Sequence, residues 1–157
     1  MSELFINQAR AVAITGHRIL NKDFCQKKLQ EKLNLFIDKG FDTFLIGMAL
    51  GFDTMCFQTL EQIRKEKNIK IIACVPCLSQ DRKYTKEQKD EYQRMLEKVD
   101  EKIVLSKDYN SKCMQKRNEF MVDNAFVVFA YLKRDFGGTA NTVKYAKKKG
   151  KSIVFFE

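Results

Sequence analysis

Three short segments of this sequence combine glycine with polar or cationic side chains in the stretches that follow apolar runs. Residues 15–18 read Thr-Gly-His-Arg, residues 47–53 contain two glycines and end in aspartate, and residues 137–139 read Gly-Gly-Thr. Glycine lets the backbone approach a ligand closely, and the free amides of glycine turns and helix N-termini bind anions. These segments therefore predict a site for a phosphate-bearing ligand.

Two side chains in the first two segments have more than one interpretation. His17 is the only histidine, and its place directly after an apolar strand favours a functional role over a place in the core. Arg18 is either a bidentate contact to phosphate or carboxylate, or a surface residue. Asp53 either caps a helix or accepts hydrogen bonds from a ribose.

A fourth segment, residues 117–123, precedes the last glycine segment and carries Arg117 between the apolar positions Met114 and Met121. This spacing places Arg117 near the inward face of a helix, although a snorkelling surface arginine has the same pattern. The candidates for a catalytic role are Arg117, Asp53, Glu119 and Asp123. The residues expected to contact a ligand are Thr15, Gly16, His17, Arg18, Gly47, Met48, Gly51, Asp53, Arg117, Asn118, Gly137, Gly138 and Thr139.

The elements that must position these residues alternate between short β-rich runs and longer stretches of helical period. The predicted strands are Ala11 to Thr15, Thr43 to Ile46, Ile69 to Val75, Lys102 to Leu105, Phe126 to Tyr131 and Ser152 to Phe156. This alternation predicts an α/β, Rossmann-like three-layer sandwich with a mostly parallel sheet of five or six strands and the first strand central. Ligands of such sheets bind beyond the C-terminal ends of the strands, where the glycine segments fall.

Five helices are expected between these strands. Asp53 is the expected N-cap of the second helix, Ser111 opens the fourth, and Gly138-Thr139 opens the fifth. Thr85 and Gln88 have the spacing of a capping box for the third helix. That helix is expected to bury its apolar side chains, Tyr92, Met95, Leu96 and Val99.

Length and composition limit the classes of protein that remain. The chain has 157 residues, 45% of them apolar, which is typical of one globular domain, so residues 1–157 are read as a single domain. No apolar run approaches a membrane helix and the N-terminus lacks the pattern of a signal peptide, so we expect a cytoplasmic protein. The formal charge of +9 raises nucleic-acid binding as a hypothesis, although most of the lysines alternate with acids on helix faces.

The five cysteines are an odd number scattered through apolar segments, which favours reduced thiols. Cys74 and Cys77 form a Cys-x-x-Cys pair, but neither a second pair nor a nearby histidine completes a zinc site. We therefore expect no metal and no cofactor.

Taken together, the glycine and arginine segments resemble the SLOG superfamily, and most closely its YpsA-like branch. More distant members are the "lonely guy" phosphoribohydrolases and DNA processing protein A. The residues that carry the resemblance run through the whole chain: Thr15 to Arg18, Gly47 to Thr54, Val75-Pro76 with Gln80, Arg117-Asn118 with Met121 to Asp123, and Gly137 to Thr139 with Thr142, Tyr145 and Ala146.

The resemblance implies a Rossmann-like sheet whose glycine loops hold a nucleotide-derived ligand, often in a sensor. Arg117 and Met121 reproduce the spacing of an arginine and a methionine in the phosphoribohydrolases. Their Pro-Gly-Gly-x-Gly-Thr loop, followed by glutamates, is not reproduced, because Gly137 lacks the proline and Asn141 and Thr142 stand where acids are expected. Cleavage of an N-glycosidic bond needs such a carboxylate.

The leading hypothesis is a sensor-type binding domain for a nucleotide or nucleotide-derived small molecule, with little or no catalysis. One alternative is an N-glycoside hydrolase of the phosphoribohydrolase kind that acts on a nucleotide. Another is binding of single-stranded nucleic acid. No membrane partner is expected. Because relatives with this fold commonly associate and 13 phenylalanines are many for this length, we also expect a homo-oligomer.

Overall fold

Six β-strands alternate with five α-helices in the computed structural model, which describes residues 6–157. The strands are β1 (Ala11–Gly16), β2 (Thr43–Ile46), β3 (Lys70–Val75), β4 (Glu101–Val104), β5 (Val127–Tyr131) and β6 (Ser152–Phe155). The helices are α1 (Gln26–Asp38), α2 (Phe52–Arg64), α3 (Lys86–Lys98), α4 (Cys113–Asp123) and α5 (Gly138–Lys148), and a single 3-10 turn, Gln8–Arg10, precedes β1.

The strands form one sheet in the order β4-β3-β2-β1-β5-β6, and every neighbouring pair is parallel. The central strand is β1, where Ile14 lies opposite Ile46 of β2 on one side and Phe129 of β5 on the other. The chain moves outward from β1 in one direction through β4 and then returns to β5. The C-terminal ends of β1 and β5 are therefore the topological switch point, where ligands of open parallel sheets bind.

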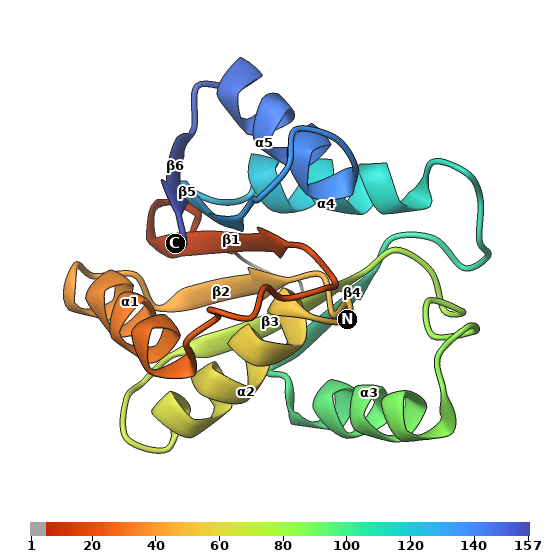
Figure 1. Ribbon diagram of the computed structural model, residues 1–157, viewed down its shortest axis with the longest axis horizontal. Helices are drawn as coiled ribbons and strands as arrows, with labels where there is room; N and C mark the ends of the chain where they lie inside the picture. The colour runs from red at the N-terminus through yellow and green to blue at the C-terminus, as the bar shows by residue number, and fades with distance from the viewer. Residues whose placement is uncertain (1–5) are drawn as a thin grey trace.

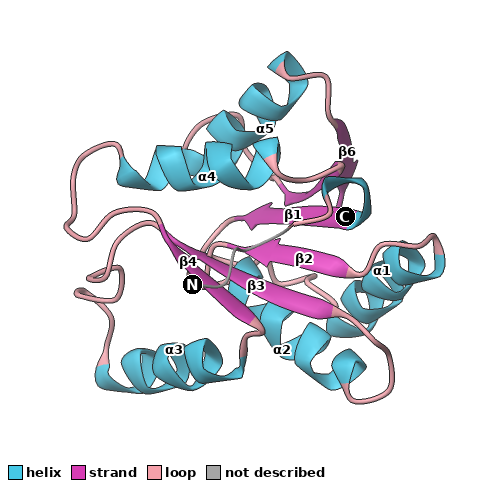
Figure 2. Ribbon diagram, turned by 180° about the vertical axis from the view of Figure 1, so that it is seen from behind, coloured by secondary structure: helices cyan, strands magenta, loops and turns pink. Residues whose placement is uncertain are grey.

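The helices cover both faces of the sheet, as right-handed crossovers require. Helices α1, α2 and α3 lie on one face and α4 and α5 on the other, and the two groups stand on opposite sides of the strands in Figures 1 and 2. Alternate strand residues serve the two layers: Val12 and Ile14 face the core under α1 and α2, whereas Ala13 faces the core under α4 and α5. Because both faces of the sheet are buried, residues of both orientations are apolar, and the strands read as continuous apolar runs.

Aromatic side chains fill much of the core on the α1–α3 face. The ring of Phe52 stacks on Tyr131 at 5.3 Å between centroids and also meets Phe129 and Phe156. Phe24 packs edge-on against the Phe52 ring. This cluster accounts for many of the phenylalanines and fixes the start of α2 against the end of β5.

Several expected boundaries were wrong by one or two residues. The fourth helix begins at Cys113 with Lys112 at the N-cap position, so Ser111 does not open it. Strand β5 begins at Val127, and Phe126 is 54% exposed because it precedes the sheet. On α3 the Thr85–Gln88 capping box is confirmed, and Tyr92 and Met95 are buried. Leu96 and Val99 are only partly buried against the core.

All five cysteines lie in the described range and are free thiols, and Cys74 and Cys77 are both buried. Residues 6–157 contain no group of three or more His, Cys, Asp or Glu side chains placed to hold a metal ion. No helix in the same range is long and apolar enough to cross a membrane.

Candidate functional site

A cleft of about 390 Å³ lies at the C-terminal ends of β1 and β5. It draws residues from the loop after β1, the β2–α2 connection, helix α4 and the start of α5, which are far apart in the sequence. The lining residues are Gly16, His17, Arg18, Ile19, Ala49, Asp53, Met114, Arg117, Asn118, Arg134, Gly138 and Thr139. The cleft thus lies at the topological switch point defined by the strand order.

One wall of the cleft is built to attract an anion. Arg18 and Arg134 are exposed and line the cleft from the loops that follow β1 and β5. Gly138 and Thr139 form the first turn of α5, whose N-cap residue Gly137 has a φ of 96°. Because the first amides of a helix have no intrahelical acceptor and carry the positive end of the dipole, they favour a negative ligand group.

Arg117 is more buried than Arg18 and Arg134, and its side chain is hydrogen-bonded within the protein. Its side chain is 6% exposed, its Nη1 donates to the carbonyl oxygens of Gly47 and Cys74, and its Nε donates to Asn118 Oδ1 at 2.7 Å. Its Nη2 lies 3.7 Å from the sulfur of Met114. A guanidinium has five N–H groups, and most of them are used here. Arg117 therefore holds α4 against β2 and β3 and has little capacity left for a phosphate.

The carbonyl of Gly47 is the point where this buried network converges. It accepts from Arg117 and also from Gln80 Nε2 at 2.9 Å, and Tyr92 donates to Gln80 Oε1 at 3.0 Å. A Cβ atom at Gly47 would lie 2.6 Å from Nη1 of Arg117. Glycine suits this position because the buried guanidinium, held by its hydrogen bonds, occupies the space of a side chain.

Asp53 is not the N-cap of α2, because that position belongs to Gly51 and Asp53 lies in the first turn. Its side chain is 5% exposed at the cleft wall, and Oδ2 accepts from the Ala49 amide at 3.2 Å. Burial raises the pKa of Asp53 to about 6, although the charges of Arg117 and Arg18 act in the opposite direction. At neutral pH the cleft thus holds a buried carboxylate with weak internal compensation.

His17 is more buried than its position after β1 suggested, since it is only 7% exposed. Its Nε2 accepts the backbone amide of Lys133 at 2.9 Å, which ties the loop after β1 to the loop after β5. Burial lowers the pKa of His17, and the nearby charge of Arg134 lowers it further. The neutral imidazole is therefore favoured, and its hydrogen bond to Lys133 gives it a structural role in holding the two cleft loops together.

The glycines of the first two segments serve close packing. Gly51 has a φ of 83°, and a Cβ there would overlap the backbone carbonyl of Arg18. A Cβ at Gly16 would overlap the ring of Phe52. Both residues bring the loops after β1 and β2 together. Met48 has a φ of 62°, a conformation that side chains rarely adopt, and is buried in the core rather than in the cleft.

Of the residues predicted from the sequence, the structure brings eight into the cleft lining: Gly16, His17, Arg18, Asp53, Arg117, Asn118, Gly138 and Thr139. The other five are not part of the cleft lining: Thr15, Gly47, Met48, Gly51 and Gly137. Neither Glu119 nor Asp123 lines the cleft. Glu119 accepts from Gln115 Nε2, and Asp123 accepts from the Tyr145 hydroxyl. The sequence analysis missed Ile19, Ala49 and Arg134, which adjoin the predicted segments, and Met114.

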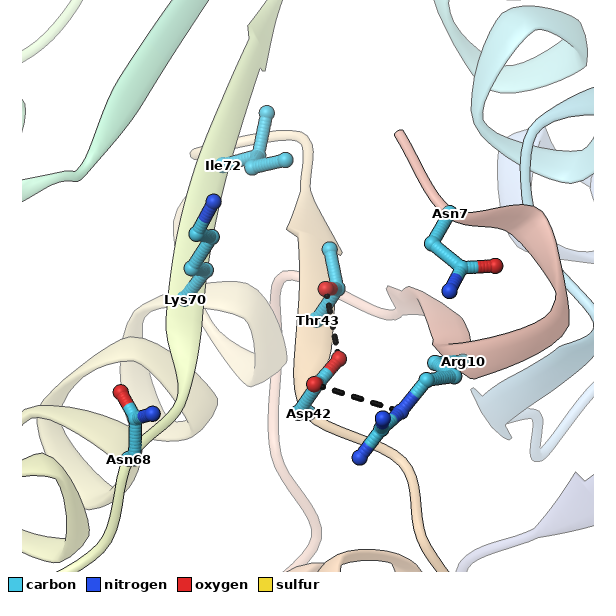
Figure 3. Close-up of a pocket in the computed structure, with 7 residues that line it drawn as sticks. All are labelled: Asn7, Arg10, Asp42, Thr43, Asn68, Lys70 and Ile72. Atoms are coloured by element: carbon cyan, nitrogen blue, oxygen red, sulfur yellow. Dashed lines mark hydrogen bonds and ion pairs between the residues drawn. The ribbon is translucent and has the colours of Figure 1, made fainter. Parts of the chain in front are cut away.

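A second pocket, of about 170 Å³, lies at the opposite edge of the sheet, where β1, β2 and β3 begin (Figure 3). Its cation Arg10 is paired with Asp42 at 3.3 Å, and Thr43 donates to the same carboxylate. Lys70 belongs to the same lining. This pocket contains none of the glycine segments, and its arginine charge is already balanced.

The sheet order and the switch-point cleft define a Rossmann-like α/β domain. The family model described as the YspA SLOG family (YpsA) matches residues 13–154, and the chain belongs to this family. The SPbeta prophage-derived protein YoqJ of Bacillus subtilis (strain 168) is 32% identical over 141 residues, which cover 77% of this chain and 81% of YoqJ. The SLOG resemblance inferred from the sequence is confirmed.

Two solved structures share the fold. DNA processing protein A of Streptococcus pneumoniae matches with a TM-score of 0.70 at 19% identity, over 94% of this chain and 50% of that chain. DNA processing protein A of Helicobacter pylori matches with a TM-score of 0.64 at 20% identity, over 95% of this chain and 66% of that chain. The chain thus spans half of the first protein and about two thirds of the second. At these identities the likeness describes the fold.

Proposed function

We propose that the cleft binds a nucleotide or nucleotide-derived small molecule and that the domain acts as a binding or sensor module. The observation that carries the proposal is that one cleft joins an anion-binding wall to a buried carboxylate. Arg18, Arg134 and the first turn of α5 supply the first, and Asp53 supplies the second. A ligand that satisfies both has a negatively charged part and a part that donates hydrogen bonds, as a sugar phosphate does.

The rim of the cleft offers apolar surface for the flat part of such a ligand. Ile19 lines the cleft and is 81% exposed, and Phe136 in the loop before α5 is 65% exposed. Arg134, which lines the cleft, stacks on Phe136 with its guanidinium carbon 4.9 Å from the ring centre. Aromatic rings and guanidinium planes are common supports for nucleobases.

The proposal favours binding over hydrolysis because two of the three candidate acids, Glu119 and Asp123, lie outside the cleft lining. Asp53 is the one acid in the cleft lining formed by the described residues. Arg117, the expected catalytic arginine, is occupied by backbone carbonyls. Release of free base from ribonucleoside monophosphates, followed by chromatography, tests the phosphoribohydrolase alternative. Turnover that is lost in Asp53→Asn would replace the binding proposal with the enzymatic one.

Binding of single-stranded nucleic acid is the second candidate. The Helicobacter pylori relative in fold is described as having a single-stranded DNA binding mode, and this chain carries a net charge of +9. A strand that follows a basic surface makes many phosphate contacts, so its affinity falls steeply with salt. A ligand held in one cleft makes few such contacts and shows a shallow salt dependence.

Calorimetric titration with the four common ribonucleoside 5′-monophosphates and 5′-diphosphates tests the proposal. Arg18→Ala and Arg134→Ala should each lower the affinity for the best of these ligands about ten- to a hundredfold, because each removes a charge-assisted hydrogen bond worth about 1.5–3 kcal/mol. Arg10→Ala is the matched control, since that arginine pairs with Asp42 at the other edge of the sheet. Equal losses from all three variants would contradict a cleft site and favour a diffuse nucleic-acid surface.

A further inference from the structure

One oxygen of Asp53 has no hydrogen-bond partner. Oδ2 accepts from the Ala49 amide, but Oδ1 is buried and unpartnered within the described part of the chain. A buried acceptor without a donor is costly, and most such atoms in folded proteins are satisfied. Asp53 belongs to the cleft lining, so a ligand hydroxyl can complete the carboxylate if binding uncovers Oδ1, which neighbouring atoms cover in this structure.

The nearby charges do not supply that donor. The guanidinium groups of Arg117 and Arg18 act on Asp53 through their charge, yet neither forms an ion pair with it within 4.0 Å in residues 6–157. Arg117 is directed to the carbonyls of Gly47 and Cys74 instead. The missing donor must therefore come from outside these groups.

Asn118 provides the complementary group on another wall of the same cleft. Its Oδ1 accepts from Arg117 Nε at 2.7 Å, which orients the amide and leaves the Nδ2 end as the donor available to the cleft. The cleft thus offers an acceptor on Asp53 and a donor on Asn118. A hydroxyl is both a donor and an acceptor, so it matches this pair, whereas a phosphate oxygen only accepts and is repelled by the carboxylate.

We propose that Asp53 accepts hydrogen bonds from the sugar hydroxyls of the ligand, so that the cleft selects ribonucleotides over nucleotides that lack those hydroxyls. This inference rests on the proposed nucleotide-binding function. Arg134 and the first turn of α5 come from the β5–α5 side of the cleft, and Asp53 comes from the β2–α2 side. Arg18, in the loop after β1, lies next to Gly51 and so between the two sides. A ribonucleotide that spans the cleft places its phosphate at one wall and its sugar at the other.

The test combines two substitutions at Asp53 with the removal of the sugar hydroxyls from the ligand. Wild type, Asp53→Ala and Asp53→Asn are titrated with the best ribonucleotide from the screen and with its 2′,3′-dideoxy counterpart. The wild type should prefer the ribonucleotide by about tenfold or more, as expected when a buried group loses its only partner. In Asp53→Ala the preference should fall to within about threefold, because neither ligand then has a carboxylate to satisfy. Thermal unfolding of each variant verifies that it is folded. Asparagine keeps one acceptor oxygen, so the preference of Asp53→Asn should lie between those of the wild type and Asp53→Ala, and this fall tests the inference if the alanine variant does not fold.

Equal affinity of the wild type for the two ligands would overturn this inference and leave the proposed function standing. A preference that survives unchanged in Asp53→Ala would overturn it too, because another residue would then recognise the sugar. A wild type that binds neither ligand would overturn both the inference and the proposed function.

Discussion

Replacing Asp53 by Asn should stabilise the ligand-free protein at neutral and alkaline pH. Folding moves this carboxyl from water to a site where its pKa is about 6 against an ordinary value of 3.8, with burial as the main cause. The folded state therefore binds a proton more tightly than the unfolded state does. The protonated carboxyl adds to the free energy of unfolding below about pH 4, and this contribution is lost as the pH rises towards 6 and the buried group ionises.

The size of this effect follows from the difference between the two pKa values. At about 1.4 kcal/mol per unit, the ionised carboxylate costs about 3 kcal/mol at neutral pH. Asparagine removes the charge, but its amide is still a buried polar group without a full set of partners. The net gain in the free energy of unfolding is therefore about 1–3 kcal/mol, and it should vanish near pH 4.

Urea unfolding of the wild type and Asp53→Asn at several pH values between about 4 and 8 measures this difference. The two proteins must be compared directly, because His17 also titrates in this range. The lowered pKa of His17 has the opposite effect, since the stability it contributes is lost as pH falls below 6.5. A variant that is less stable than the wild type at pH 8, or a difference that does not change with pH, would refute the assignment of Asp53 as a costly buried carboxylate.

Three further predictions concern the frame of the cleft and the assembly. Gly51→Ala should lower the free energy of unfolding, measured by chemical denaturation, by about 1–3 kcal/mol or more, because φ is positive and a Cβ would meet the loop after β1. Gly138→Ala is the control and should fold normally, because a Cβ there would have open space around it. Arg117→Ala should lower the free energy of unfolding by about 1.5–3 kcal/mol, because buried carbonyls lose their donor, and a variant as stable as the wild type would contradict the network described. Light scattering at tens of micromolar should give a mass above that of one chain, since Phe126 and Phe155 are exposed, and a monomer mass would count against this expectation.

The fold could be predicted from the sequence because its signals are local and consistent. Short continuous apolar strands and helices with clear end signals alternate through the chain, and the capping box at Thr85 and the glycine start at Gly138 agree with the helices observed. Boundaries such as Ser111 could not be placed well. Helix α4 lacks a side-chain cap, so the tertiary packing of Cys113 and Arg117 determines where it begins.

The segments that build the cleft could be predicted as well, but the division of tasks among their residues could not. Sequence spacing placed Arg117 on the inward face, yet only the structure shows that Gly47 and Cys74 occupy its donors. The orphaned oxygen of Asp53 depends on the packing of α2 against two neighbouring loops. Such contacts between residues distant in sequence leave no local pattern, which is also why the role of Arg134 was missed.

The central claim is that the cleft at the ends of β1 and β5 binds a nucleotide. Backbone amide chemical shifts recorded by NMR during titration with the best ribonucleotide from the screen test it most directly. We predict that the largest changes fall on Gly138, Thr139 and Arg18, with the side-chain amide of Asn118 among them. Changes spread along the lysine-bearing outer faces of α3 and α5, with the cleft residues unmoved, would contradict the account.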